Sequence, residues 1–338
     1  MVKKVSRKKS LEKLKNSKKR KKRIKLFGVV ILVFIFVFNI ETVKTQKKYA
    51  NSEVYSTENI KVNPEQEIKN ETTISQLDIN NEEETTKKED TLESKENTKV
   101  KEIIDEYRKN NNLNEGNFAF FYYRPDTEEY YIYNEDTFFT AASTIKVPIA
   151  MIYYDKIYNN DLTKDSTFKY KSSHYEAGAG NTASQYKPGN EIKLSFLLEQ
   201  MIVESDNTAT NILKDNLGGE KAYRILIKQY TSKDFPEEFN IDNLTSAGFG
   251  LDIIKKIYSN QEKYSELIEL MKKSSGGGYL KKDVSCEVAH KYGSFEGYVH
   301  DYGICYADTP YIIGVFTKDV DDAENLIAQI NKKIMELK

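Results

Sequence analysis

The sequence predicts an α+β fold: a central antiparallel five-stranded sheet covered by helices, with an additional all-helical lobe. Two observations support this prediction. Short runs rich in aromatic and β-branched residues lie at both ends of the domain, and the segments between them have helical spacing of apolar residues. Strands at both ends with helices between them indicate one sheet built from the two halves of the chain.

The first two strands are expected at residues 117–123 and 130–134. The turn residues Arg124, Pro125, Asp126 and Thr127 follow the first of them, which is typical of a hairpin. A helix is expected just before them, at residues 100–111.

The other three strands are expected near the C-terminal end. They are residues 288–294, 301–307 and 311–318. An amphipathic helix, residues 322–337, closes the domain. The helices of the middle region include residues 194–202, 208–216 and 251–258.

Charge is segregated along the chain, although the net charge is only −1. Residues 1–25 carry 14 Lys and Arg against one acid, Glu12, a net charge of +13. The whole chain has 51 Lys and Arg and 52 Asp and Glu. The rest of the chain therefore carries 37 basic and 51 acidic residues, a net charge of −14. A basic tail can bind nucleic acid, but here an apolar run at residues 26–40 follows it directly. Together they predict a cytoplasmic tail and a membrane-targeting segment, and no nucleic-acid partner.

Residues 26–40 are a membrane anchor or the apolar core of a signal peptide. The length fits a signal peptide, but no small-x-small cleavage motif follows, which favours an uncleaved single-pass anchor. In both cases we expect the bulk of the protein to lie outside the cytoplasmic membrane, and cleavage would make it secreted. Residues 41–97 have few apolar side chains and are predicted to be a disordered linker. Residues 98–338 are then the folded domain, expected to be monomeric.

Two cysteines and three histidines allow little metal or disulfide chemistry. Cys286 and Cys305 are expected on neighbouring strands, either as a disulfide or as two packed thiols. His174, His290 and His300 lack the spacing of a metal site. No metal and no cofactor are predicted.

The strongest chemical signal is Ser143 followed by Lys146 at the start of an apolar helix. Residues three apart share one helix face, so the amine can reach the hydroxyl. A desolvated lysine has a lowered pKa and can accept the serine proton. The bare Ser-x-x-Lys spacing is unspecific, since it recurs at Ser6, Ser10 and Ser166 without such a helix.

Two further motifs follow in order: Ser205-Asp206-Asn207 between helices and Lys291-Tyr292-Gly293 on a predicted strand. With Ser143 and Lys146 they make the chain resemble the penicillin-recognising serine hydrolases, above all the class A β-lactamases. The resemblance covers residues 98–338 and implies the β-lactamase/transpeptidase-like fold.

The resemblance implies roles for seven residues. The catalytic ones are Ser143 as nucleophile, Lys146 as its base and Ser205 as proton relay to the leaving nitrogen. The substrate-binding ones are Asn207, Lys291, Gly293 and Ser294. Asn207 would hold the substrate amide and Lys291 its carboxylate. The N–H groups of Ser143 and Ser294 would form the oxyanion hole.

The sequence departs from the class A pattern at two places. Tyr292 stands where threonine is usual, and Ser294 could supply the missing hydroxyl. Aligning Asn240 with the family's asparagine places Pro236 where the acid that activates the deacylating water is expected. Glu237 or Glu238 could act as this base only if the loop is shifted, and both could equally be surface acids.

We therefore expect a serine hydrolase that is acylated by β-lactams and deacylates slowly. One alternative is a D,D-peptidase that acts on peptidoglycan stem peptides, and another is a non-catalytic wall-binding or sensor module. The expected partners are a β-lactam or a stem peptide, and the membrane through residues 26–40.

Overall fold

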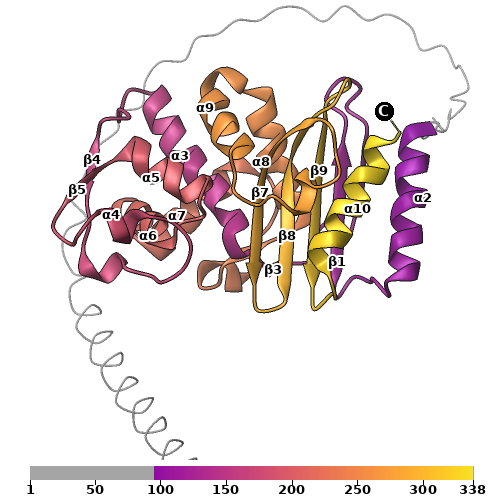
Figure 1. Cartoon of the computed structure of the whole chain (residues 1–338), viewed down its shortest axis with the longest axis horizontal. Coiled ribbons are helices and arrows are strands. Elements are labelled where there is room, and N and C mark those ends of the chain that lie inside the picture. Colours follow the sequence, from indigo (N-terminus) through magenta and orange to yellow (C-terminus); the bar gives the residue numbers. More distant parts are fainter. Residues whose placement is uncertain (1–94, 338) are drawn as a thin grey trace, which may run out of the picture. The chain divides into compact units, whose positions relative to one another are not determined.

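The computed structural model describes residues 95–337 (Figure 1). The predicted tail, the apolar segment at residues 26–40 and the linker up to residue 94 lie outside the described residues. Within residues 95–337 no helix is both long and apolar enough to cross a membrane. The first described helix begins at Lys95, three residues before the predicted start of the folded domain.

The main sheet is antiparallel and five-stranded, with the order β2-β1-β9-β8-β7. Its strands are β1 (Phe118–Tyr123), β2 (Tyr130–Tyr133), β7 (Glu287–Phe295), β8 (Tyr298–Tyr306) and β9 (Tyr311–Lys318). Because β1 pairs with β9, the two chain halves share one sheet, as predicted. Two small sheets pair β3 (Phe139–Thr140) with β6 (Leu244–Thr245), and β4 (Thr167–Lys169) with β5 (Glu191–Lys193).

The α-helices flank this sheet and form the separate lobe (Figure 1). They are α2 (Lys95–Asn110), α3 (Lys146–Tyr158), α4 (Thr182–Gln185), α5 (Leu194–Ile202), α6 (Asn207–Asn216), α7 (Glu220–Ile227), α8 (Ala247–Ser259), α9 (Gln261–Lys272) and α10 (Ala323–Met335). Short 3-10 turns are η1 (Ala142–Ile145), η2 (Ser172–His174), η3 (Lys228–Tyr230), η4 (Glu237–Asn240) and η5 (Tyr279–Lys281).

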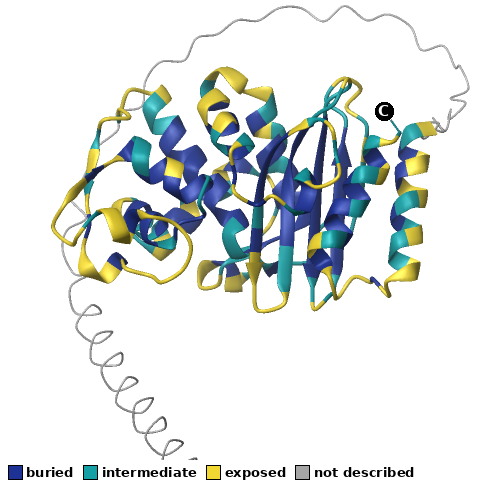
Figure 2. Cartoon of the chain, in the orientation of Figure 1, coloured by how far each residue is buried: buried dark blue, intermediate teal, exposed yellow. Residues whose placement is uncertain are grey.

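Strand β1 is buried along its whole length, because the sheet is covered on both faces (Figure 2). Alternate side chains enter two different cores. Phe118, Phe120 and Tyr122 pack with residues of α2 and α10, whereas Phe121 packs with the core that includes α3 and α8. The sequence FAFFYY is therefore apolar at every position and does not alternate with polar residues.

Helix α10 is fixed to the sheet by the fully buried Asn331. Its Nδ2 donates to the carbonyl oxygen of Leu280 at 2.7 Å, and its Oδ1 accepts from the hydroxyl of Tyr311 at 2.8 Å. The side-chain amide also contacts the sulfur of Cys305 at 3.5 Å. One amide thus joins α10 to η5, β8 and β9.

The two cysteines lie on the neighbouring segments that the sequence predicted. Cys286 directly precedes β7, and Cys305 on β8 stands opposite Val288. Both are free thiols in the structure. Burial raises the pKa of Cys305, whereas a hydrogen bond with Cys305 lowers the pKa of Cys286.

Replacing the buried amide should destabilise the domain. We expect Asn331→Ala to lower the free energy of unfolding by about 1–3 kcal/mol, because buried polar partners lose a hydrogen bond. Urea unfolding of the full-length protein measures this. Asn325→Ala on the same helix is the control, since the Asn325 amide only accepts from Lys282 at the surface. Equal losses in the two variants would contradict the anchoring role of Asn331.

Candidate active site

Ser143 lies in the 3-10 turn η1, and the α-helix begins three residues later at Lys146. The sequence had placed both residues within one α-helix. The backbone before Ser143 is constrained: Ala142 has a φ of 48°, in the left-handed region. Asn243 clamps this turn, because its Nδ2 donates to the Ala142 carbonyl at 2.9 Å and its own carbonyl accepts from the Ala141 N–H at 2.7 Å.

The side chain of Lys146 is buried and surrounded by acceptors. Its Nζ lies 2.6 Å from the carbonyl oxygen of Ser205, 3.2 Å from the Ser205 Oγ and 2.8 Å from the Asn207 Oδ1. Burial lowers the pKa of Lys146 well below its usual value, and the charges of Lys291 and Lys214 lower it further. A neutral amine at this place can accept a proton.

The loop between α5 and α6 presents these acceptors. Ser205 has a φ of 57°, so the backbone turns sharply just before α6. The buried Asp206 caps α6 by accepting from the N–H of Ala209 at 2.8 Å, and it also accepts from the N–H of Thr182 at 2.8 Å. These bonds fix the loop, so that Ser205 and Asn207 both reach Lys146.

Strand β7 lies against the nucleophile through Gly293. A Cβ on Gly293 would come within 2.8 Å of the Ser143 nitrogen and 3.1 Å of the Ala141 carbonyl oxygen. Only glycine allows this close approach. Lys291 lies on the same face of the strand, two residues earlier, and is fully buried. Burial lowers the pKa of Lys291 to about 7, whereas the Asp301 carboxylate acts in the opposite direction.

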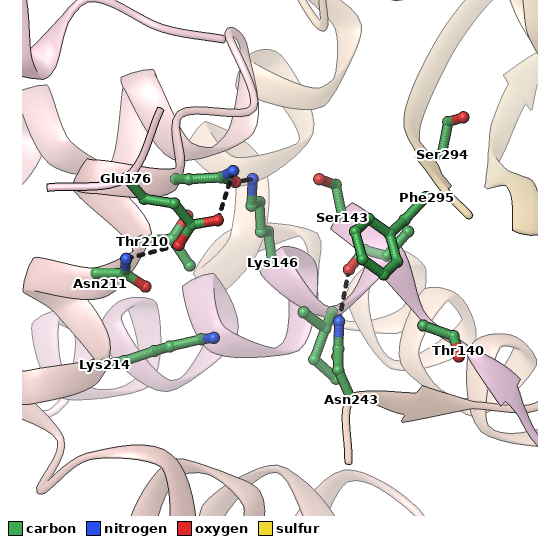
Figure 3. A pocket seen from close by; sticks show the side chains of 13 residues that line it. Thr140, Ser143, Lys146, Glu176, Thr210, Asn211, Lys214, Asn243, Ser294 and Phe295 are labelled. Atoms are coloured by element: carbon green, nitrogen blue, oxygen red, sulfur yellow. Dashed lines mark hydrogen bonds between the residues drawn. The ribbon is translucent and has the colours of Figure 1, made fainter. Parts of the chain in front are cut away.

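Tyr292 and Ser294 face the other side of β7, as strand alternation requires. The ring of Tyr292 stacks on that of Tyr279, with centroids 4.9 Å apart. Ser294 borders the cavity described next, but its hydroxyl points away from Ser143 (Figure 3).

These segments enclose a cavity of about 260 Å³. Four of the predicted residues line it: Ser143, Lys146, Asn207 and Ser294. Ser205, Lys291 and Gly293 lie behind this lining, where they contact or electrostatically influence its residues.

Sequence reasoning missed several residues of the cavity wall, namely Glu176, Asn211, Lys214 and Asn243. Asn211 and Lys214 lie four and seven residues after Asn207, so helical spacing could have placed them on its face of α6. Glu176 follows η2 in a loop and carries no motif. Among the described residues it is the only acid that lines the cavity.

Glu237 and Glu238 do not line this cavity. Both are exposed on η4, whereas the next residue, Phe239, is buried. The ring of Phe239 packs on that of Phe235, with centroids 4.1 Å apart. Because this aromatic contact faces the core, the two acids face solvent.

Solved structures show what this architecture is similar to. It aligns with TLA-1 extended-spectrum β-lactamase at a TM-score of 0.63 and 23% identity, covering 72% of this chain and 99% of that one. A mutant of PBP-A, solved as an acyl-enzyme with penicillin G, aligns at a TM-score of 0.62 and 23% identity, covering 71% of this chain and 96% of that one. A β-lactamase from Sphaerobacter thermophilus aligns at a TM-score of 0.60 and 21% identity, covering 71% of this chain and 97% of that one. The fold is therefore the one shared by β-lactamases and PBP-A.

The fold and the family assignment define a β-lactamase-like serine hydrolase. The chain belongs to the beta-lactamase enzyme family, whose model matches residues 97–337. The resemblance seen in the sequence is confirmed.

The approach of β7 to Ser143 can be tested with a single methyl group. We expect Gly293→Ala to slow covalent labelling by a fluorescent penicillin about tenfold or more, because displacing a reacting group by ~1 Å can cost about 10²-fold. Gly277→Ala is the control, since a Cβ there meets no atom within 4 Å. Unchanged labelling of Gly293→Ala would contradict this geometry.

Proposed function

We propose that the protein forms an acyl-enzyme with β-lactams at Ser143 and hydrolyses it slowly. The observation that carries this proposal is the buried amine of Lys146, which lies within hydrogen-bond distance of three oxygen atoms beside a cavity that Ser143 also lines. In the proposed step Ser143 Oγ attacks the lactam carbonyl carbon while Lys146 accepts the serine proton. The C–N bond then breaks, and Ser205 delivers a proton to the leaving nitrogen.

The proposed substrate orientation follows from the two sides of the site. Asn207 would bind the amide of the acyl side chain at the α6 side. The strand around Gly293 would lie along the substrate backbone, and Lys291 would attract the substrate carboxylate from behind. The N–H groups of Ser143 and Ser294 would bind the oxyanion.

Slow deacylation is proposed because Glu237 and Glu238 are exposed and outside the cavity. Glu176, the one acid of residues 95–337 that lines it, is held by amide donors of α6. In the view of Figure 3 it lies beyond Lys146 from Ser143. The same observation favours a second candidate, a D,D-peptidase that acts on peptidoglycan stem peptides and is trapped by penicillins.

We further propose that residues 26–40 hold the catalytic domain at the outer face of the cytoplasmic membrane. The support is the basic tail that precedes this apolar run in the sequence. Carbonate extraction and external protease treatment of intact cells test it. Release of the domain into the medium would support the secreted form instead.

Ser143→Ala should abolish labelling by penicillins without unfolding the domain, because the nucleophilic oxygen is lost and the side chain becomes smaller. Lys146→Ala should also lose labelling, since no histidine among residues 95–337 lines the cavity to replace this base. Mass spectrometry after exposure to penicillin measures both, and the melting temperature of Ser143→Ala checks folding. A labelled peptide recovered from folded Ser143→Ala would place the nucleophile elsewhere.

The wild type should accumulate the acyl-enzyme. General-base activation of water contributes about 10²–10⁴-fold in rate, so its absence should make deacylation rate-limiting. Rapid-quench mass spectrometry after one exposure to benzylpenicillin measures the decay. Fast decay that is lost in Glu237→Gln or Glu238→Gln would identify a shifted loop, and loss in Glu176→Gln would identify Glu176 as the base. Cleavage of a D-Ala-D-Ala peptide would favour the peptidase.

A further inference from the structure

We infer that Glu176 makes the site selective for substrates with a positively charged amine on the acyl side chain. This inference rests on the proposed function, because it needs Asn207 to bind the amide of that side chain. It adds a residue and a substrate class that the sequence motifs do not contain.

The carboxylate of Glu176 is held in place by helix α6. Its Oε1 accepts from the Asn207 Nδ2 at 2.9 Å, and its Oε2 accepts from the Asn211 Nδ2 at 2.8 Å. The backbone of Glu176 is tied to Thr208, whose hydroxyl lies 3.2 Å from both its N–H and its carbonyl oxygen. The position of the negative charge is therefore set by three residues of one helix.

Among the described residues, no cation pairs with this charge. Both donors are neutral amides, and among residues 95–337 no ion pair includes Glu176. The ammonium of Lys214, which also lines the cavity, lies 3.0 Å from Glu220 and 4.9 Å from the ring centroid of Tyr223. Lys146 has a strongly lowered pKa. A carboxylate oxygen has about two acceptor positions, so each oxygen of Glu176 keeps one for a ligand.

Glu176 is on the acyl side of the proposed substrate. The side chain of Asn207 connects Lys146 to Glu176: its Oδ1 accepts from Lys146, and its Nδ2 donates to Glu176. The substrate carboxylate would lie at the other side, near β7. Glu176 also lines a second cavity of about 460 Å³, together with other residues of its loop. Because Asn207 and Glu176 are hydrogen-bonded, a charged group attached next to the bound amide would lie near the Glu176 carboxylate.

The effect of the Glu176 charge can be tested with three penicillins that have nearly the same shape but differ in the charge of the acyl side chain. Ampicillin is benzylpenicillin with an added α-amino group, and carbenicillin carries an α-carboxylate in its place. A solvent-exposed ion pair contributes about 0.2–1 kcal/mol, which is about 1.4- to 5-fold in rate. The measured quantity is the second-order rate constant of acylation, obtained by mass spectrometry on the full-length protein in detergent.

In the wild type, the ampicillin-to-benzylpenicillin ratio of acylation rate constants should exceed the carbenicillin-to-benzylpenicillin ratio. Glu176→Gln should lower the ampicillin-to-benzylpenicillin ratio and raise the carbenicillin-to-benzylpenicillin ratio, each about 1.4- to 5-fold. Glu199→Gln removes the same charge from an exposed position on α5, and both ratios should stay at the wild-type values. Ratios that do not differ between Glu176→Gln and wild type would overturn the inference.

A measurement on the wild type alone guards against misfolding of the variant. Raising the salt concentration should shrink the ampicillin-to-carbenicillin ratio, since salt screens an exposed charge, and a ratio independent of salt would overturn the inference. If benzylpenicillin itself fails to acylate the wild type, the proposed function is wrong and the inference falls with it. Normal acylation with charge-independent ratios overturns the inference alone.

Discussion

The amine of Lys146 is the group on which the arrangement of the site depends. A charged lysine in a buried place would be costly, so burial favours the neutral form and so creates a base. The amine is nonetheless satisfied, because its two N–H groups donate to the Ser205 carbonyl and the Asn207 Oδ1, and the Ser205 hydroxyl lies within hydrogen-bond distance of its lone pair at 3.2 Å. These contacts hold the beginning of α3 against the loop before α6. The same interaction therefore joins two segments of the chain and prepares one of them for chemistry.

The side-chain amide of Asn207 extends this arrangement to the cavity wall. Its oxygen faces Lys146 and its nitrogen faces Glu176, so both partners fix the orientation of the amide. Behind the opposite wall, Lys291 is fully buried, and on the other face of β7 the buried side chains of His290 and Asp301 lie 2.6 Å apart. A fixed carboxylate thus lies on one side of the cavity, and a buried lysine with a pKa lowered to about 7 lies behind the other.

Sequence reasoning was most successful where a pattern reflects a local physical requirement. The strands were found because aromatic and β-branched residues favour a covered sheet. The motifs with fixed spacing led to Ser143, Lys146 and Asn207, which line one cavity in the structure. It was less successful where the position of a residue depends on tertiary contacts. Glu176 is far from Asn207 in the sequence and has no periodic neighbours, so nothing local indicated that it enters the cavity. For Glu237 and Glu238 the sequence left both alternatives open, a base on a shifted loop or surface acids, because their orientation depends on the burial of Phe239, which a loop alignment does not contain. The 3-10 turn at Ser143 depends on the clamp by Asn243, a residue of another segment.

The pairing of β1 with β9 determines when this domain can fold. Strand β9 separates β1 from β8, so the early hairpin has no partner in the sheet until the last strand has been synthesised. Contacts between segments so far apart in the sequence form slowly, because a long loop must close first. In the meantime the aromatic strand FAFFYY is exposed, and such segments associate readily with other chains. During synthesis of this protein there is therefore an interval in which an aggregation-prone strand, not yet paired with β9, is exposed to other chains.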